Sequence, residues 1–186
     1  MQKCLSTLVF ISFLIASTNG NAQLTKIGGG FSLATGGKYI YNDYEYYNGS
    51  IGFDIRAEFD INKSIKIVPD FQIFLPTTSE YILGGESKTT LLTLDLNGHF
   101  IIASSKKVDF YGIGGLHLGG WNIEDKHTTM IEDEIDNSAF KIDVAANLGA
   151  GVEIKITRQL GIFADLKYIV SNSNQLVFTP GLIYEF

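Results

Sequence analysis

The sequence predicts an all-β fold, an eight-stranded antiparallel up-and-down barrel, and two observations carry this prediction. Apolar residues alternate with small or polar ones in segment after segment, and this period of two is typical of strands. The connections between the segments mostly alternate between tight turns and long loops, as they do when one end of a barrel carries the loops. No competing helical periodicity runs for a useful length.

Six segments alternate cleanly, and two glycine-rich segments complete the set of eight strands. One face of each clean segment is dominated by Ile, Leu, Phe and Val, and the other by Gly, Ala, Ser, Thr, Asn and charged residues. The glycine-rich segments are 27–35 and 108–118, and their phase is less clear. In chain order, the predicted strands cover 27–35, 51–59, 65–75, 92–100, 108–118, 140–154, 160–168 and 176–186.

The predicted connections differ in both length and charge. The stretches 36–49, 76–87 and 119–139 are long, whereas 60–64, 103–107, 157–159 and 170–174 are short. In an up-and-down barrel the three long stretches and 170–174, which breaks the alternation by being short, lie at one end, and the other three turns lie at the opposite end. The turns then carry Lys63, Lys106, Lys107 and Arg158, and the long stretch 119–139 carries Glu124, Asp125, Glu132, Asp133, Glu134 and Asp136.

Length and composition exclude several classes of protein. The chain of 186 residues suits one domain, and an apolar content of 45% excludes intrinsic disorder. A formal net charge of -6 argues against a nucleic-acid partner, because phosphate binding needs a basic face. The single cysteine, Cys4, excludes a disulfide framework and a cysteine-based zinc site. We expect no cofactor.

The first 22 residues have the pattern of a secretory signal peptide. Lys3 supplies the positive start, and the apolar run from Leu5 to Ala16 is too short to span a bilayer. Ala22 is the small residue expected just before a cleavage site. We therefore predict a signal peptide over 1–22 and an exported barrel domain over 23–186.

Alternation alone does not say which face of the barrel points inward. A soluble barrel buries its bulky apolar face, whereas a membrane barrel turns that face to lipid and keeps a polar lumen. Strand length favours the membrane barrel, because about nine to eleven tilted residues span a bilayer. On that interpretation the polar face forms a lumenal charge network that plugs the barrel, made of Asp54, Arg56, Glu58, Asp70, Lys141, Asp143, Glu153, Asp165 and Lys167.

The last strand carries the most specific motif of the chain. Thr179, Gly181, Tyr184 and Phe186 provide a polar residue, a glycine two later, an aromatic three later and a terminal aromatic. This pattern resembles the terminal strand signal of bacterial outer-membrane barrels, and the chain resembles the small barrels of the OmpA transmembrane-domain and OmpX kind. The resemblance covers the mature chain in architecture, but only the last strand residue by residue. Pro180 lacks a backbone donor, so we expect a bulge or locally broken pairing there.

The resemblance implies a location and a set of partners. It implies the outer membrane of a Gram-negative envelope, with lipid and lipopolysaccharide around the barrel. It also implies that Thr179, Gly181, Tyr184 and Phe186 serve the barrel-assembly machinery. We expect no nucleic-acid partner, and the loop ligand stays open.

The remaining candidates lie in the loops and among the histidines. Tyr44, Tyr46, Tyr47 and Trp121 are candidates for an outer-loop interaction surface, with an interfacial aromatic belt as the alternative. The acidic run 131–137 lacks the EF-hand spacing, so we expect a solvated loop and no metal site. Three histidines, His99, His117 and His127, are possible catalytic bases, but Ser171 and Ser173 have no histidine beside them.

These observations lead to one functional hypothesis and two alternatives. The hypothesis is a non-enzymatic outer-membrane barrel with a plugged polar lumen, whose outer loops serve adhesion, ligand binding or envelope stability. The first alternative is a secreted soluble barrel of the lipocalin or avidin kind that holds a small apolar ligand. The second is a barrel enzyme that modifies lipid A.

Overall fold

The computed structural model describes residues 23–35, 37–41, 44–48, 50–80, 85–128, 134–171 and 174–186. Within these ranges, side chains are not described for 37–48, 79–80, 85, 125–128 and 134–137. The predicted signal peptide, 1–22, lies outside the described residues. In the described part of the chain, no helix has the length and apolar character needed to cross a membrane.

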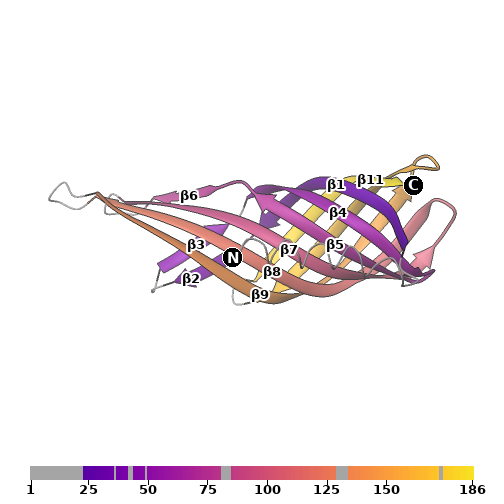
Figure 1. Ribbon diagram of the computed structural model, residues 1–186, viewed down its shortest axis with the longest axis horizontal. Helices are drawn as coiled ribbons and strands as arrows, with labels where there is room; N and C mark the ends of the chain where they lie inside the picture. The colour runs from indigo at the N-terminus through magenta and orange to yellow at the C-terminus, as the bar shows by residue number, and fades with distance from the viewer. Residues whose placement is uncertain are drawn as a thin grey trace, which may run out of the picture.

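The fold is a closed antiparallel barrel with eight positions (Figure 1). Neighbouring strands pair in chain order, and β1 pairs with β11 to close the sheet. β5 and β6 both pair with β7, one after the other along its length, so together they fill one position. The predicted fold class is confirmed. The strands are β1 (Gln23–Thr35), β4 (Ile51–Asn62), β5 (Ile65–Phe74), β6 (Thr77–Glu80), β7 (Gly85–Ser104), β8 (Val108–Thr128), β9 (Glu134–Lys155), β10 (Leu160–Val170) and β11 (Gln175–Glu185).

The two ends of the barrel differ. At one end, the short connections 63–64, 105–107 and 156–159 join neighbouring strands, and we call it the turn end. The opposite end, called the loop end, carries β6 and the far halves of β7, β8 and β9. Between β1 and β4 the chain also forms a separate two-stranded ribbon of β2 (Gly37–Tyr41) and β3 (Tyr44–Asn48). β3 lies against β6 and β7.

Three strands are much longer than the sequence pattern predicts. β7, β8 and β9 have 20, 21 and 22 residues, whereas β10 and β11 have 11 each. They project beyond the rest of the barrel at the loop end, on the left of Figure 1. The predicted loops 76–87 and 119–139 are therefore largely strand, and continuous pairing of β8 with β9 out to Thr128 and Glu134 supports the projection.

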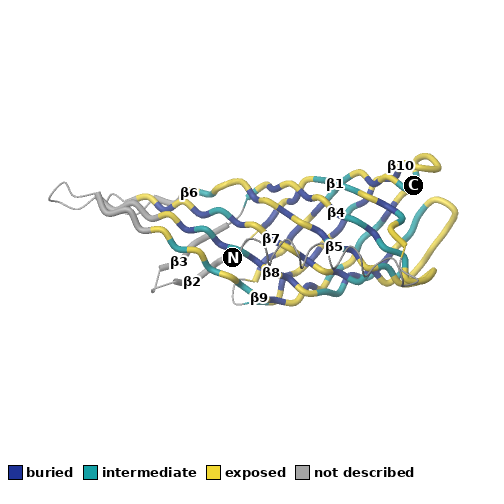
Figure 2. Tube along the Cα trace, viewed as in Figure 1, coloured by how far each residue is buried: buried dark blue, intermediate teal, exposed yellow. Residues whose placement is uncertain are grey.

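The bulky apolar face of the strands points outward. Along the strands of the barrel wall whose side chains are described, exposed and buried residues largely alternate, as Figure 2 shows. Large apolar side chains such as Phe53, Phe71 and Leu94 are exposed, whereas charged side chains of opposite parity, such as Arg56 and Lys167, are buried. A water-soluble barrel needs the reverse arrangement, because water disfavours a continuous apolar exterior. The soluble lipocalin-like or avidin-like alternative is therefore wrong.

Pairing is interrupted beside Pro180, as the sequence predicts. The ladder between β1 and β11 joins Gly30 to Gly181 and then resumes at Leu33 and Phe178, in the same register. Pairing of β11 with β10 is continuous through Pro180. Inside the barrel, Ser32 Oγ and Thr179 Oγ1 lie 3.0 Å apart in a hydrogen bond that spans the interrupted stretch. A side-chain bond thus connects the two strands where the backbone ladder is missing.

Candidate functional site

The inward side chains of the strands form three charged groups, stacked from the turn end toward the loop end. The first group lies nearest the turns and comprises Lys26, Glu58, Lys66 and Glu153. Lys26 Nζ donates to Glu153 Oε1 at 2.5 Å, and Lys66 Nζ donates to Glu58 Oε2 at 2.8 Å. The two cations also approach the opposite carboxylates, each at 3.8 Å. Two cations and two acids from four strands thus close the turn end of the lumen.

The second group centres on Arg56. Its Nη1 donates to Asp165 Oδ2 at 2.6 Å, and its Nε donates to Asp54 Oδ1 at 3.1 Å. The guanidinium lies 3.7 Å from the centre of the Phe163 ring, in cation–π contact. Tyr111 Oη donates to Asp165 Oδ1 at 2.6 Å. Burying an arginine is tolerable here because its charge is paired on two sides.

The third group centres on Lys167. Its Nζ donates to Asp70 Oδ2 at 2.8 Å and to Asp95 Oδ2 at 2.6 Å. His117 Nδ1 lies 2.6 Å from the other oxygen of Asp95. Asn97 Nδ2 donates to Asp70 Oδ2 at 3.1 Å. Lys167 therefore links carboxylates on β5 and β7 from its place on β10.

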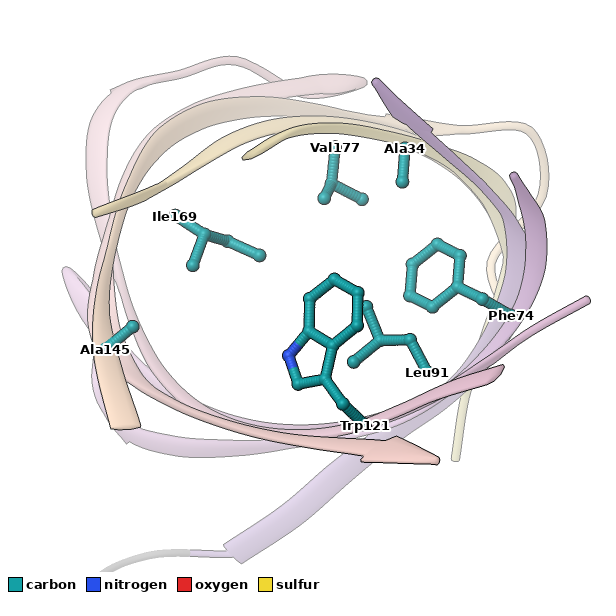
Figure 3. Close-up of a cluster of buried hydrophobic side chains, with 7 residues drawn as sticks. All are labelled: Ala34, Phe74, Leu91, Trp121, Ala145, Ile169 and Val177. Carbon is teal, nitrogen blue, oxygen red and sulfur yellow. The ribbon is translucent and has the colours of Figure 1, made fainter. Parts of the chain in front are cut away.

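Above the third group, toward the loop end, the interior becomes apolar. The order along β10 shows the change, because Asp165, Lys167 and Ile169 follow one another on its inward face. Figure 3 shows seven apolar side chains on the inner wall of the barrel at this level. This apolar plate consists of Ala34, Phe74, Leu91, Trp121, Ala145, Ile169 and Val177.

Glycines leave the room that the large interior side chains need. Gly151 pairs with Tyr111 on one side and Asp165 on the other. A Cβ at Gly151 would overlap both the Tyr111 ring and the Asp165 carboxylate. The absence of a side chain at Gly151 therefore makes room for the Tyr111–Asp165 pair.

Replacing Gly151 with valine is expected to destabilise the barrel by about 1–3 kcal/mol, because the added atoms force the Tyr111–Asp165 pair apart. The measurement is the midpoint of urea-induced unfolding in lipid vesicles. Gly112→Val is the matched control, because a Cβ at Gly112 meets only the end of the Ile102 side chain, at ordinary contact distance. Equal midpoint shifts for the two variants would contradict the space requirement.

The nine residues of the predicted lumenal network do not all take part in these groups. Lys141 and Asp143 on β9 are only half-buried, and they lie toward the loop end, beyond the third group. The other seven are buried inside the barrel and belong to the three groups: Asp54, Arg56, Glu58, Asp70, Glu153, Asp165 and Lys167.

Several members of the groups are absent from the predicted set. Lys26 precedes Gly28, Gly29 and Gly30, and these glycines hide the phase of the first strand. Asp95 lies on the polar face of a clean segment, where the alternation could have found it. His117 lies on the second glycine-rich strand, whose phase is equally unclear from the sequence. Weak periodicity explains the omission of Lys26 and His117, whereas Lys66, like Asp95, lies on the polar face of a clean segment.

The predicted loop candidates have different outcomes. Trp121 is not in an outer loop: its side chain is 2% exposed and belongs to the apolar plate inside the barrel. The reason is that β8 continues past it as strand, with Trp121 on the inward parity opposite Leu91. Tyr44, Tyr46 and Tyr47 lie on β3, but their side chains are outside the described residues.

Two of the three candidate histidines lie inside the barrel rather than on its outer face. His99 and His117 are both buried within the barrel, and His99 stacks on Tyr111 with ring centres 4.5 Å apart. The side chain of His127 is outside the described residues. Over the described residues, no group of three or more His, Cys, Asp or Glu side chains is placed to hold a metal ion.

The four residues of the predicted assembly motif divide between the two faces of β11. Thr179 faces inward and is buried, whereas Tyr184 and Phe186 are exposed on the outer face near the turn end. Their rings meet edge to face with centres 5.7 Å apart. Gly181 is half-buried beside Phe163, where a Cβ would overlap the ring. The aromatic members are therefore accessible from the lipid side.

A closed eight-stranded barrel with an apolar exterior and an ion-paired interior defines a class of protein, the small transmembrane β-barrels of the outer-membrane type. The outer membrane is where barrels of this type reside, and its lipid faces the apolar exterior.

Comparison with known proteins agrees with this class. The chain is similar to OprG of Pseudomonas aeruginosa, with a TM-score of 0.60, 11% identity, and coverage of 90% of this chain and 98% of that chain. It is similar to Ail, the attachment invasion locus protein of Yersinia pestis, with a TM-score of 0.59, 15% identity, and coverage of 88% and 100%. It is also similar to the N-terminal barrel domain of OprF of Pseudomonas aeruginosa, with a TM-score of 0.53 and 16% identity. This match covers 89% of this chain and 99% of that chain. No family model matches the sequence, and no curated protein matches it either.

Proposed function

We propose that the protein is a non-enzymatic outer-membrane barrel that conducts little and acts through its loop end. The filled interior is the observation that supports this proposal most directly. Three ion-paired groups occupy the lumen, and the apolar plate lies between them and the loop end. Ions crossing such a lumen have to break paired charges and pass desolvated apolar side chains, and both steps are costly.

The loop end is the proposed interaction surface because β6 to β9 project there beyond the barrel. Ail was crystallised with the heparin analogue sucrose octasulfate. In this chain, the segment 119–139 holds six acids and one lysine, so a sulfated polyanion is disfavoured. A basic or neutral partner suits this charge better, and Tyr44, Tyr46 and Tyr47 remain candidate contacts for it. Adhesion, ligand binding and envelope stability are all compatible with such a surface.

A lipid A-modifying enzyme is the less favoured function. Such an enzyme needs a histidine and a serine together at the outer rim, on the lipid-facing side. His99 and His117 lie inside the barrel instead, where lipid does not reach them. The similar structures named above are an attachment protein and two barrels with no enzyme activity in their names, which also supports a non-enzymatic role.

The proposal includes two sets of partners at the barrel wall. Outer-membrane lipid and lipopolysaccharide surround the apolar exterior. The barrel-assembly machinery recognises Thr179, Gly181, Tyr184 and Phe186, and the outward position of Tyr184 and Phe186 supports that role.

The function is tested by ion conductance in planar bilayers. We expect the wild-type barrel to show no long-lived open state. Trp121→Ala combined with Leu91→Ala removes two paired members of the apolar plate and is expected to raise conductance, because the plate then admits water. Leu118→Ala, on the outward face of β8, is the matched control and leaves conductance unchanged. Large, stable currents through the wild-type barrel would contradict the proposal.

A further inference from the structure

A groove lies in the described outer wall of the barrel near the turn end. It has a volume of about 200 Å³ and lies where β1, β11 and β10 adjoin. Apolar side chains make most of its lining, which comprises Ile27, Gly28, Gly29, Leu160, Leu182, Ile183 and Tyr184.

Gly29 forms the floor of the groove. It has outward parity on β1, and its neighbours across the strands are Leu182 and Ile55, both exposed apolar residues. A Cβ at Gly29 would meet one heavy atom within 4 Å, the backbone carbonyl oxygen of Asp54 at a close 3.1 Å, and the space on its other sides is open. Gly29 therefore leaves a gap between apolar side chains of the exterior, and the gap faces lipid.

A cation lies in the turn next to this end of the groove. Arg158 is exposed in the turn 156–159, two residues before Leu160, which lines the groove. The turn is well ordered, because Thr157 Oγ1 accepts hydrogen bonds from the backbone N–H groups of Gln159 and Leu160. Gln159 O accepts from the backbone N–H of Glu185 at 2.7 Å, which ties the turn to the end of β11.

Charge around Arg158 favours an anion. Among the described residues Arg158 is exposed and has no ion-pair partner, whereas the nearby Glu185 carboxylate lies 3.7 Å from Lys155 Nζ. The backbone N–H of Lys155 donates to Lys107 O at 2.8 Å, so the neighbouring turn, with exposed Lys106 and Lys107, adjoins this one. The acid of that turn region, Asp109, accepts from Ser104 Oγ. Three exposed cations thus lie on two adjoining turns.

We propose that this groove binds an anionic glycerophospholipid, with an acyl chain over Gly29 and the phosphate against Arg158. The groove opens onto the bilayer, so the molecules that reach it are membrane amphiphiles. An apolar trough ending at a cation matches an acyl chain ending at a phosphate. Turn ends of outer-membrane barrels face the periplasm, and the occupant is therefore a phospholipid of the periplasmic leaflet. This site is separate from the lumen and does not depend on the function proposed above.

The test is native mass spectrometry of the full-length protein in detergent, titrated with phosphatidylglycerol and with phosphatidylethanolamine of the same chain length. We expect the anionic lipid to bind more tightly. Arg158→Gln is expected to weaken binding of the anionic lipid roughly fivefold. This is the change in affinity that corresponds to the attraction between one cationic side chain and an anionic lipid surface. Gly29→Leu fills the groove and is expected to weaken binding of the anionic lipid about tenfold. This is the loss expected when about two methylene groups of the acyl chain are no longer buried in the groove.

Matched control variants distinguish binding at this groove from nonspecific attraction of anionic lipid to exposed cations. Lys63→Gln removes an exposed cation from a different turn, between β4 and β5, and leaves affinity unchanged. Ala146→Leu adds the same bulk at an outward position of β9, on a strand that does not line the groove. The shift in gel mobility on heating verifies folding of each variant. Equal losses for Arg158→Gln and Lys63→Gln, unchanged affinity for Gly29→Leu, or equal binding of the two lipids would each overturn the proposal.

Discussion

Replacing Arg56 with leucine is expected to lower the free energy of unfolding by about 3–5 kcal/mol. The change removes the contacts of the guanidinium to Asp54 and Asp165 at 3.1 and 2.6 Å. Both carboxylates stay buried in the lumen and lose their principal cation. The cost therefore reflects two uncompensated charges more than one lost side chain, and urea-induced unfolding in lipid vesicles measures it.

Two further variants separate charge from packing. Arg158→Leu removes an exposed arginine from a turn and is expected to change stability by less than about 0.5 kcal/mol. Adding Asp54→Asn and Asp165→Asn to Arg56→Leu removes the stranded charges and is expected to recover part of the loss. If Arg56→Leu cost no more than Arg158→Leu, the interior would be wet and its ion pairs screened.

The strands and their faces follow from the sequence because the period of two survives wherever the exterior meets lipid. β4 shows this well: Phe53, Ile55 and Ala57 face out, and Asp54, Arg56 and Glu58 face in. Which charges pair is a different matter. Arg56 and Asp165 are 109 residues apart, on strands that are not neighbours, and their contact depends on the register of the whole barrel. Local alternation contains no information about that register.

The extension of β8 does not follow from the sequence pattern because the apolar residues of this strand change faces near the loop end. On β8 near the loop end, Trp121 and Ile123 face inward and Asn122 faces outward, as in a water-soluble sheet. On β9 the apolar residues stay outward at the same level, where Phe140 and Ile142 pair with Asn122 and Gly120 and are exposed. The change of face within β8 looks like the end of a strand, and the sequence pattern therefore predicts a loop there. Trp121 falls within that predicted loop for the same reason.

The second prediction with a large expected effect concerns the apolar exterior of the barrel. Leu148→Arg is expected to destabilise the barrel by about 2–4 kcal/mol, the cost of an arginine near the bilayer midplane. Leu148 is 60% exposed and lies within the outward apolar row of β9, between Val144 and Ile154. Its neighbours on β8 and β10 are Gly114 and Tyr168. Unfolding in vesicles gives the energy, and the fraction of protein recovered in the outer membrane gives the consequence in cells.

The cost of an exposed arginine depends on its depth in a bilayer, and this dependence makes the prediction specific to a membrane protein. Ile102 is even more exposed, at 75%, but lies beside the turn that carries Lys106 and Lys107. Ile102→Arg is therefore expected to cost about 0–1 kcal/mol, because near the interface the guanidinium reaches water and phosphate. In a barrel surrounded by water, both substitutions replace an exposed apolar side chain with a charged one, and neither is costly. A large penalty at Leu148 with a small one at Ile102 requires a solvent whose polarity changes along the barrel axis, and a bilayer is such a solvent.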